Sequence, residues 1–403
     1  MKTARAWKFR LYPTKAQAKE MQTHLWFSKN LWNDGLELAK QLYADHQKFP
    51  TRNTYQEISK NSGLYSQAAQ DVFIRLDLAI KAKLRRKKAG LKGGFPRFKS
   101  MDRMKSLHYP QSGFSLNGKK LKVTPFGEIN IKKHRELEGN IKTLTLKKEA
   151  AGKWYAIFTS ETDVKPVPKN NRSVVGMDLG LINFAVLSDG TVIKNPRHLK
   201  KHQDNLRAKQ KALSRAKRGS SNRKKAKKRL AAVHEKVRNA RRDFLHKLSR
   251  QLVNSHSLIA LEDLASQEMA EKQFGKSIND AGWSEFISML SYTTGNEVPC
   301  APMFDASNIR EAEGAGSRVV FVNPKSTTKE CSRCGILTDK DLSERQHNCP
   351  SCGLSMSRDL NAAINILTRA TGGTPGSNAC EDETSTARQV SSMKQEAHAF
   401  RRG

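Results

Sequence analysis

The sequence has few acidic residues for a chain of its size. Its 403 residues include 38 Asp and Glu against 73 Lys and Arg, so the formal net charge is +35 and the pI is near 10.1. A charge this far from zero exceeds what solubility requires and indicates a polyanion as the main partner. Nucleic acid is the first candidate.

The sequence also lacks the features of membrane and secreted proteins. No run approaches the roughly eighteen apolar residues that a membrane-spanning helix needs. Residues 1–8 have no apolar core of the kind found in signal peptides. Cysteine is scarce, with six residues, four of them in a metal-binding pattern, and this suits a reducing compartment. We therefore expect no membrane association and a cytoplasmic location.

Four of the cysteines form two Cys-x-x-Cys pairs. Cys331 and Cys334 make the first pair, and Cys349 and Cys352 follow after fourteen residues. Two such pairs at this separation fit tetrahedral zinc, because each pair presents two thiolates to one ion. The alternatives are four unrelated buried cysteines or a redox pair. Four thiolate ligands leave no open coordination position, so we expect the zinc to be structural.

Residues 1 to about 168 indicate a small antiparallel β-barrel with helices inserted between its strands. Alternation of Trp7, Phe9 and Leu11 predicts a strand that ends at Pro13. Capping-box spacing from Thr14 predicts a helix start, and a second long helix is expected over 66–88. Further short strands are expected at 114–116, 121–123, 128–131, 141–147 and 154–162.

Two acidic residues follow buried strands in the second half of the chain. Asp178 comes near the end of an apolar strand that begins at Ser173, with Gly180 beside it. Glu262 and Asp263 end a second strand that begins at Ser257. Successive side chains point to opposite faces of a strand, so only one of the two can join Asp178. We choose Glu262 and expect Asp263 to cap the exit of the strand.

A third acid, Asp359, follows the second cysteine pair by seven positions. Ser357 is the expected N-cap of a helix with an apolar stripe at positions 360, 363, 364 and 367, so Asp359 lies in its first turn. The acid is either favoured there by the helix dipole or a metal-binding carboxylate. Together with Asp178 and Glu262 it supplies hard oxygen ligands for two Mg²⁺ ions that clamp a phosphodiester.

Basic residues concentrate in a few stretches. Residues 198–250 carry about twenty Lys and Arg against three acids, in a pattern typical of a helical hairpin that turns near Gly219. A solvated helix face is one reading, but so one-sided an excess favours nucleic-acid binding. The candidate phosphate contacts are Arg85, Arg86, Arg97, Lys99, Arg223, Lys224, Lys225, Lys227, Lys228, Arg238, Arg241 and Arg242.

Several short motifs occur together between residue 5 and about residue 370. They are Gly176-Met-Asp178-Leu-Gly180, Leu261-Glu262-Asp263-Leu264, the four cysteines, Ser357-Arg358-Asp359-Leu-Asn361-Ala-Ala-Ile-Asn365, Arg10-Leu-Tyr-Pro13, Phe95-Pro-Arg-Phe98, Phe244-Leu-His-Lys247 and Gly282-Trp283. With these motifs the chain resembles the TnpB (OrfB-type) family of insertion-sequence proteins, compact relatives of the type V CRISPR effector nucleases. In that resemblance Asp178, Glu262 and Asp359 match the metal-binding triad, and Arg358 a substrate-phosphate contact.

The resemblance implies an α/β fold combined with a β-barrel. A RuvC-like, RNase H-type nuclease domain (173–325 and 355–370) would be interrupted by a zinc ribbon (326–354). It would be preceded by a wedge-like β-barrel (1–13 and 95–168) that carries a helical recognition insert (14–94). Residues 371–403, rich in Gly, Ser, Thr and charge, are expected to be a disordered tail.

The resemblance also implies a function. It implies RNA-guided, metal-dependent cleavage of double-stranded DNA next to a short transposon-adjacent motif, by a monomer in a bacterial or archaeal cytoplasm at the nucleoid. The guide RNA would come from the element's own end. Zinc would be structural and Mg²⁺ catalytic. The alternatives are a nuclease-inactive or weakened guided DNA-binding repressor, and an unguided RNase H-type transposase or resolvase.

One segment departs from the family pattern. Residues 293–310 look inserted where the family continues a helix expected to pack near the nuclease site. We interpret the segment as a tolerated loop; the alternative is a lesion that lowers activity and favours the repressor.

Overall fold

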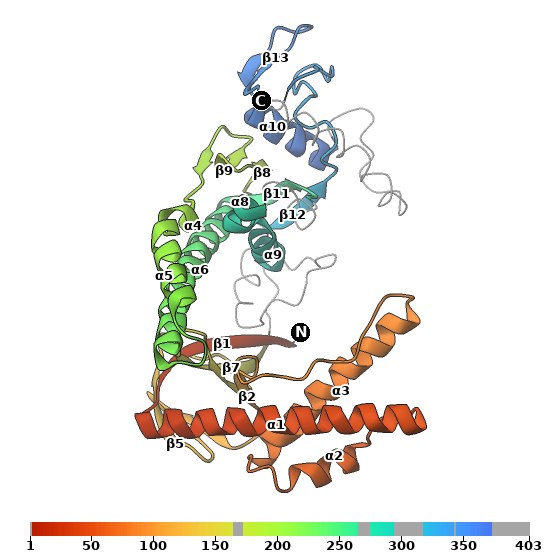
Figure 1. Cartoon of the computed structure of the whole chain (residues 1–403). Helices are drawn as coiled ribbons and strands as arrows, with labels where there is room; N and C mark the ends of the chain where they lie inside the picture. The colour runs from red at the N-terminus through yellow and green to blue at the C-terminus, as the bar shows by residue number, and fades with distance from the viewer. Residues whose placement is uncertain (1, 164–171, 265–274, 294–316, 342–343, 373–403) are drawn as a thin grey trace. The chain divides into compact units, whose positions relative to one another are not determined.

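The computed structural model describes residues 2–163, 172–264, 275–293, 317–341 and 344–372 (Figure 1). The chain divides into two compact units. Of the described residues, the first contains 2–163 and 199–242, and the second contains 172–198, 243–264, 275–293, 317–341 and 344–372. Among the described residues no helix is both long and apolar enough to cross a membrane. The segment 293–310 and the tail 371–403, for which the sequence suggested an insertion and disorder, lie almost wholly outside the described residues.

The first unit is built on a seven-stranded antiparallel sheet in the order β2-β6-β7-β1-β5-β4-β3. The strands are β1 (Lys2–Tyr12), β2 (Ser106–Tyr109), β3 (Phe114–Asn117), β4 (Lys120–Val123), β5 (Gly127–Lys132), β6 (Asn140–Lys148) and β7 (Trp154–Asp163). The sheet is curled, as shown by a hydrogen bond between its two edges. The Tyr109 hydroxyl at one edge donates to the Thr124 carbonyl near the other, at 2.9 Å. Strand β2 was missed from the sequence.

Three helices pack against this sheet in the first unit. They are α1 (Lys15–His46), α2 (Arg52–Ser59) and α3 (Ser66–Lys88). The expected capping box is confirmed, since the Thr14 side chain and the Gln17 side chain each accept from the other's backbone N–H. The first unit shares one apolar core that runs from β1 through α1 and α3 to β7.

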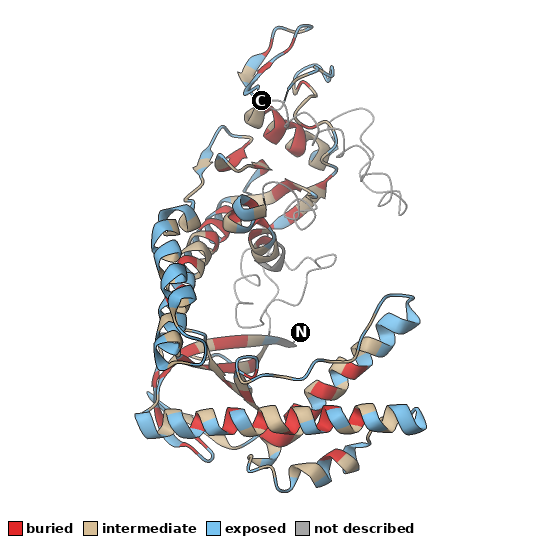
Figure 2. Ribbon diagram, viewed as in Figure 1, coloured by how far each residue is buried: buried red, intermediate tan, exposed pale blue. Residues whose placement is uncertain are grey.

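A helical hairpin of α5 (Gln203–Arg215) and α6 (Ser221–Ser255) follows the short helix α4 (His198–Lys201). The sequence predicted this hairpin and its turn. The first unit includes α6 as far as Arg242. Figure 2 shows that α5 and the start of α6 are mostly exposed, and in α5 no residue is buried. Most of the charged side chains of α5 and of the start of α6 are therefore in contact with solvent.

The second unit is organised around a five-stranded mixed sheet in the order β10-β9-β8-β11-β12. The strands are β8 (Ser173–Leu179), β9 (Asn183–Leu187), β10 (Val192–Lys194), β11 (His256–Glu262) and β12 (Arg318–Val322). Strands β8, β11 and β12 are parallel, whereas β9 and β10 join the sheet antiparallel. The carboxyl ends of β8 and β11 therefore lie at the same edge.

Helices cover both faces of this sheet. Phe184 of β9 packs edge-on against Phe244 of α6 and Phe286 of α9 (Trp283–Thr293), and α8 (Gly275–Ala281) joins the same core. Helix α10 (Arg358–Thr371) packs on the other face, where Ala260, Val322 and Ile366 form a separate cluster. Alternation along each strand assigns successive residues to these two faces.

The apolar stripe expected on α10 was partly wrong. The fully buried residues are Ala362, Ala363 and Ile366, together with the polar Asn361 and Asn365. Positions 360, 364 and 367 are half-buried. The helix is rotated from the expected orientation because its two asparagines satisfy backbone groups of a neighbouring segment, as described below.

Candidate active site

Three acidic side chains meet at one edge of the sheet in the second unit. Strands β8 and β11 pair in parallel register, with Gly176 opposite Ala260. Asp178 and Glu262 each lie two positions further on, so both point to the face that α10 covers. Asp359 lies in the first turn of α10. Asp263 follows the last residue of β11 and is exposed.

The charges of these acids interact. Burial, together with the neighbouring charges of Glu262 and Asp359, raises the pKa of Asp178 to about 8 against the opposing charge of Arg358. Burial also raises the pKa of Glu262, against the hydrogen bond from Thr327 and the charge of Arg369. Burial and two neighbouring carboxylates thus disfavour the ionised form of Asp178, which a bound cation would stabilise.

The donor set fits a divalent cation in its chemistry. Mg²⁺ prefers carboxylate oxygens, and three are brought to one site. In the structure, Asp359 Oδ1 accepts a hydrogen bond from Arg358 Nη2 at 3.3 Å. Arg345 Nη1 lies 4.0 Å from the same oxygen. Among the described residues, only the four cysteines have ligand atoms close enough together to hold a metal ion without rearrangement. The acids are thus joined by their charges rather than by close oxygen contacts.

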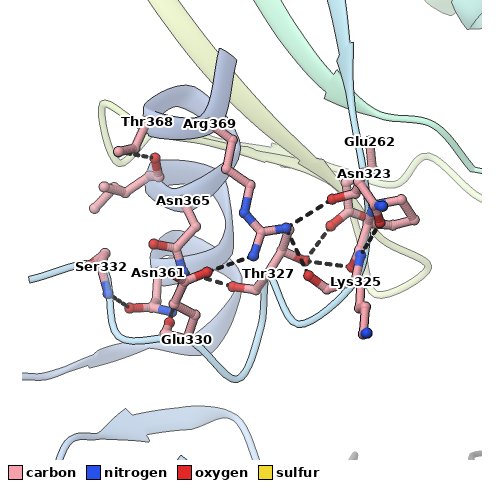
Figure 3. Close-up of polar contacts among 12 residues, drawn as sticks. Glu262, Asn323, Lys325, Thr327, Glu330, Ser332, Asn361, Asn365, Thr368 and Arg369 are labelled. Carbon is pink, nitrogen blue, oxygen red and sulfur yellow. Dashed lines mark hydrogen bonds and ion pairs between the residues drawn. The ribbon is translucent and has the colours of Figure 1, made fainter. Parts of the chain in front are cut away.

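A row of polar side chains on α10 lies beside the acids and was missed from the sequence (Figure 3). Asn361, Asn365 and Arg369 are spaced four residues apart, so they share one side of the helix. All three donate to backbone carbonyls of residues 323–330, the segment between β12 and the first cysteine pair. The signal was present in the sequence as two asparagines at i, i+4 in an otherwise apolar stretch.

The four cysteines form a compact cluster in the second unit. Cys331 Sγ lies 3.6 Å from Cys352 Sγ and Cys334 Sγ lies 3.5 Å from Cys349 Sγ, and all four sulfurs lie within 4.8 Å of one another. Both pairs have the same local turn, because Cys331 N–H donates to Ile336 O and Cys349 N–H donates to Leu354 O. This arrangement fits one tetrahedral zinc ion.

The antiparallel pair β13 (Gln346–Asn348) and β14 (Ser355–Ser357) frames the second cysteine turn and leads directly into α10. We expect Cys331→Ser to lower zinc content and the unfolding temperature and to reduce activity as a consequence, because zinc binding contributes directly to folding. Metal analysis and thermal unfolding measure this. The exposed non-ligand Ser351→Ala is the matched control. Full stability and activity of the Cys331→Ser protein would contradict the structural role.

Parts of the chain match known protein families. Residues 157–273 match a family model described as "Probable transposase" (OrfB of IS605 elements), and residues 309–366 match one described as "Cas12f1-like, TNB domain". Residues 1–48 match a "Helix-turn-helix domain" model, although the structure has strand β1 and the single helix α1 there.

Curated relatives cover most of the chain. A "Putative RNA-guided DNA endonuclease" of Streptomyces pristinaespiralis is 30% identical over 380 residues, 90% of this chain and 88% of the relative. The chain belongs to the OrfB (TnpB) family. A second relative, "Putative RNA-guided DNA endonuclease InsQ" of Escherichia coli K12, is 29% identical over 321 residues, 75% of this chain and 74% of its own.

A solved structure shares the fold of this TnpB family member. It is described as "Cryo-EM structure of the Cas12f1-sgRNA-target DNA complex", and it aligns with a TM-score of 0.52 at 12% identity. The alignment covers 91% of this chain and 99% of that one. The fold of this chain is therefore similar to that of Cas12f1 in that complex.

The structure separates the basic candidates of this TnpB protein into two groups. Several are exposed and belong to helix ends or loops: Arg85, Arg86, Arg97, Lys224, Lys225 and Lys228. Others have partners within the protein. Arg223 donates to the carbonyls of Leu213 and Ala216 at the carboxyl end of α5. Lys227 forms an ion pair with Asp102 at 2.5 Å.

Lys99 is the clearest case of a basic candidate with a packing role. Its ammonium lies 3.2 Å from the centre of the Trp32 ring, and burial lowers its pKa to about 8. Asn33 fixes the backbone of Lys99 through hydrogen bonds of 2.8 and 3.1 Å. Arg238 faces Glu149 at 3.7 Å, Arg358 contacts Asp359, and Arg241 and Arg242 also have partners.

Proposed function

We propose that this TnpB family member is an RNA-guided, metal-dependent DNA endonuclease. The observation that carries the proposal is the meeting of Asp178, Glu262 and Asp359, from three separate elements, in one charge-coupled site. The printed names of two relatives that align over most of their length support RNA guidance and DNA as the substrate. The net charge of +35 suits a protein that holds both an RNA and a DNA.

We infer that the second unit is a RuvC-like nuclease domain of the RNase H type. Its support is a mixed sheet whose parallel strands β8 and β11 end in acids, with a third acid on the helix packed against them. The cysteine cluster enters between β12 and α10 and would form its inserted zinc ribbon. The curled sheet and helices α1 to α3 of the first unit would form the wedge-like barrel and recognition insert.

In the mechanism we propose, Asp178, Glu262 and Asp359 hold Mg²⁺. When bound, Mg²⁺ supplies charge stabilisation for the phosphate and lowers the pKa of an attacking water. Arg358, which pairs with Asp359, would contact the scissile phosphate. Hydrolysis leaves a 5′ phosphate and a 3′ hydroxyl. Base pairing with the guide would choose the target, while the protein reads the adjacent motif and the nucleic-acid backbone.

The decisive experiment is expression of the gene with its downstream flank, followed by sequencing of the RNA that copurifies. A discrete RNA that spans the end of the element, together with Mg²⁺-dependent cutting of a matched DNA, supports the proposal. Random cellular RNA with cutting that needs no guide indicates an unguided nuclease. A discrete RNA without cutting indicates a guided DNA-binding repressor.

The raised pKa of Asp178 predicts a pH-dependent stability in the absence of divalent cations. Between its ordinary pKa of 3.8 and its folded value of about 8, the carboxyl holds a proton in the folded protein and loses it on unfolding. Stability therefore falls as pH rises through this window. From pH 6 to pH 8 we expect wild type to lose about 4 °C more in Tm than Asp178→Asn. Added Mg²⁺ should reduce the difference at pH 8.

Thermal unfolding of both proteins without added divalent cations measures this effect. Chelators are omitted because they would remove zinc as well. Equal losses in Tm for the wild type and the variant would show that Asp178 is not protonated in the folded protein.

A further inference from the structure

The segment that leads into the zinc cluster contacts the candidate active site. We propose that Thr327 is a positioning residue that holds the Glu262 carboxylate in place, and that helix α10 sets the place of Thr327. The inference rests on the proposed cation site at Glu262, and it assigns a role to a residue outside the acids.

The contact between Thr327 and Glu262 is short and buried. Thr327 Oγ1 donates to Glu262 Oε1 at 2.5 Å, and the Thr327 residue is 2% exposed. The Pro324 carbonyl is a second acceptor within reach, at 3.2 Å. A hydroxyl has one proton, and the charged carboxylate at shorter range is the stronger acceptor. The bond engages Oε1 of the Glu262 carboxylate and so restricts the orientation of that group.

Helix α10 fixes the backbone of this segment through its own side chains (Figure 3). Asn365 Nδ2 donates to Thr327 O at 2.8 Å and to Glu330 O at 2.7 Å. Arg369 Nη1 donates to Asn323 O at 2.9 Å and to Lys325 O at 2.7 Å. One helix therefore holds carbonyls before, at and after Thr327, which limits where its hydroxyl can lie.

The same helix reaches the first cysteine turn. Asn361 Nδ2 donates to Glu330 O at 2.7 Å, and Asn361 Oδ1 accepts from Ser332 N–H at 2.9 Å. Cys331 lies between these two residues. Because α10 also carries Asp359, one rigid element places a zinc ligand turn, the hydroxyl that orients Glu262, and the third acid. Second-layer contacts of this kind orient metal ligands in many proteins.

A packing role alone is the competing explanation. In that case Thr327 fills space between β12 and α10, and valine, which has the same shape, would replace it without consequence for cation binding. The positioning role requires the hydroxyl itself. The two explanations therefore differ in whether serine, which keeps the hydroxyl but not the methyl group, restores cation affinity.

The test compares Thr327→Val, Thr327→Ser and Thr368→Val in the RNA-loaded protein. Thr368 is the matched control. It lies on α10, the helix that holds the Thr327 segment, and its hydroxyl donates to Ile364 O within that helix. Mn²⁺ binding is measured by calorimetry, with the titration of Asp178→Asn subtracted to remove ions held by the RNA. Zinc content and Tm are measured on the same samples, and the Mg²⁺ concentration for half-maximal cleavage is determined separately.

We expect Thr327→Val to weaken Mn²⁺ binding about 10- to 100-fold with zinc content unchanged. Thr327→Ser should stay within about threefold of wild type, and Thr368→Val should match it. Equal Mn²⁺ affinity in wild type and Thr327→Val would overturn the inference, as would failure of Thr327→Ser to restore binding. If wild type and Asp178→Asn bind Mn²⁺ equally, the cation site of the proposed function fails instead.

A second variant examines the role of α10. Asn365→Leu removes the donor to Thr327 O and Glu330 O while keeping a side chain of similar length. We expect weaker Mn²⁺ binding than in wild type, although Thr327 itself is unchanged. Wild-type affinity in a folded, zinc-containing Asn365→Leu protein would show that α10 does not set the place of Thr327.

Discussion

Asp178→Ala should abolish DNA cleavage and leave binding of the guide RNA intact. Removal of one carboxylate lowers the negative charge that holds the cation, and we expect the cleavage rate to fall at least about 100-fold, as it does when one group is removed from a preorganised charge-stabilising site. The basic residues of α5 and α6 lie outside this site and are unaffected. Cleavage of a matched DNA and retention of RNA are measured on the same preparation.

The neighbouring acids supply a matched comparison. Glu262→Gln should behave like Asp178→Ala, because Glu262 points to the face covered by α10. Asp263→Asn, which removes the same charge one position later from an exposed side chain, should keep nearly full activity. Loss of cutting in Asp263→Asn but not in Glu262→Gln would reverse the assignment of the second acid. Undiminished cutting in Asp178→Ala would refute the proposed site altogether.

Gly176→Ala should destabilise the second unit more than alanine at any other of its glycines without a positive φ. A Cβ at this position would lie 2.1 Å from the Ala363 carbonyl oxygen and 2.7 Å from the Leu367 nitrogen, both backbone atoms of α10. Helix backbone cannot yield as a flexible side chain can, so α10 must move away from β8. We expect a loss of about 3 kcal/mol and a fall in Tm of roughly 6 °C or more.

Displacement of α10 has a functional consequence as well, because the helix carries Asp359. We expect cleavage by Gly176→Ala to be lost even below its unfolding temperature. Gly94→Ala is the control, since nothing lies within 4 Å of a Cβ there, and its Tm should change little. A Gly176→Ala protein with wild-type Tm and cleavage would mean that α10 does not pack against β8 in solution.

Much of the local structure followed from the sequence. The helix expected over 66–88 is α3 with the same bounds, and the expected strands match β3 to β7 closely. These elements have strong local signals: capping residues, turn glycines, and alternation of period two along strands with one buried face. Strands β2, β13 and β14, of three or four residues each, were missed; β3 and β4 are as short, but the Asn117-Gly118 turn between them marks a hairpin.

The candidate site was accessible from the sequence only in part. The cysteine spacing predicted the cluster, and strand parity required a choice between Glu262 and Asp263, of which Glu262 was taken. The close approach of α10 to Gly176 was not predicted from the sequence. Lys99 and Arg223 stay predicted phosphate contacts, and the structure adds a contact within the protein for each: Lys99 lies over the Trp32 ring, and Arg223 donates to the Leu213 carbonyl of α5. Charge alone does not distinguish a basic side chain that faces solvent from one that caps a helix.

The sequence by itself determined the element order, the zinc pattern, the charge and the three acids, because these depend on residue type and spacing. Only the tertiary structure decided which side of α10 is buried. A helix period predicts that the apolar residues face inward, yet Asn361 and Asn365 lie inside because backbone groups of residues 327–332 need partners there. Those partners are about thirty residues away in sequence, and no local pattern records them.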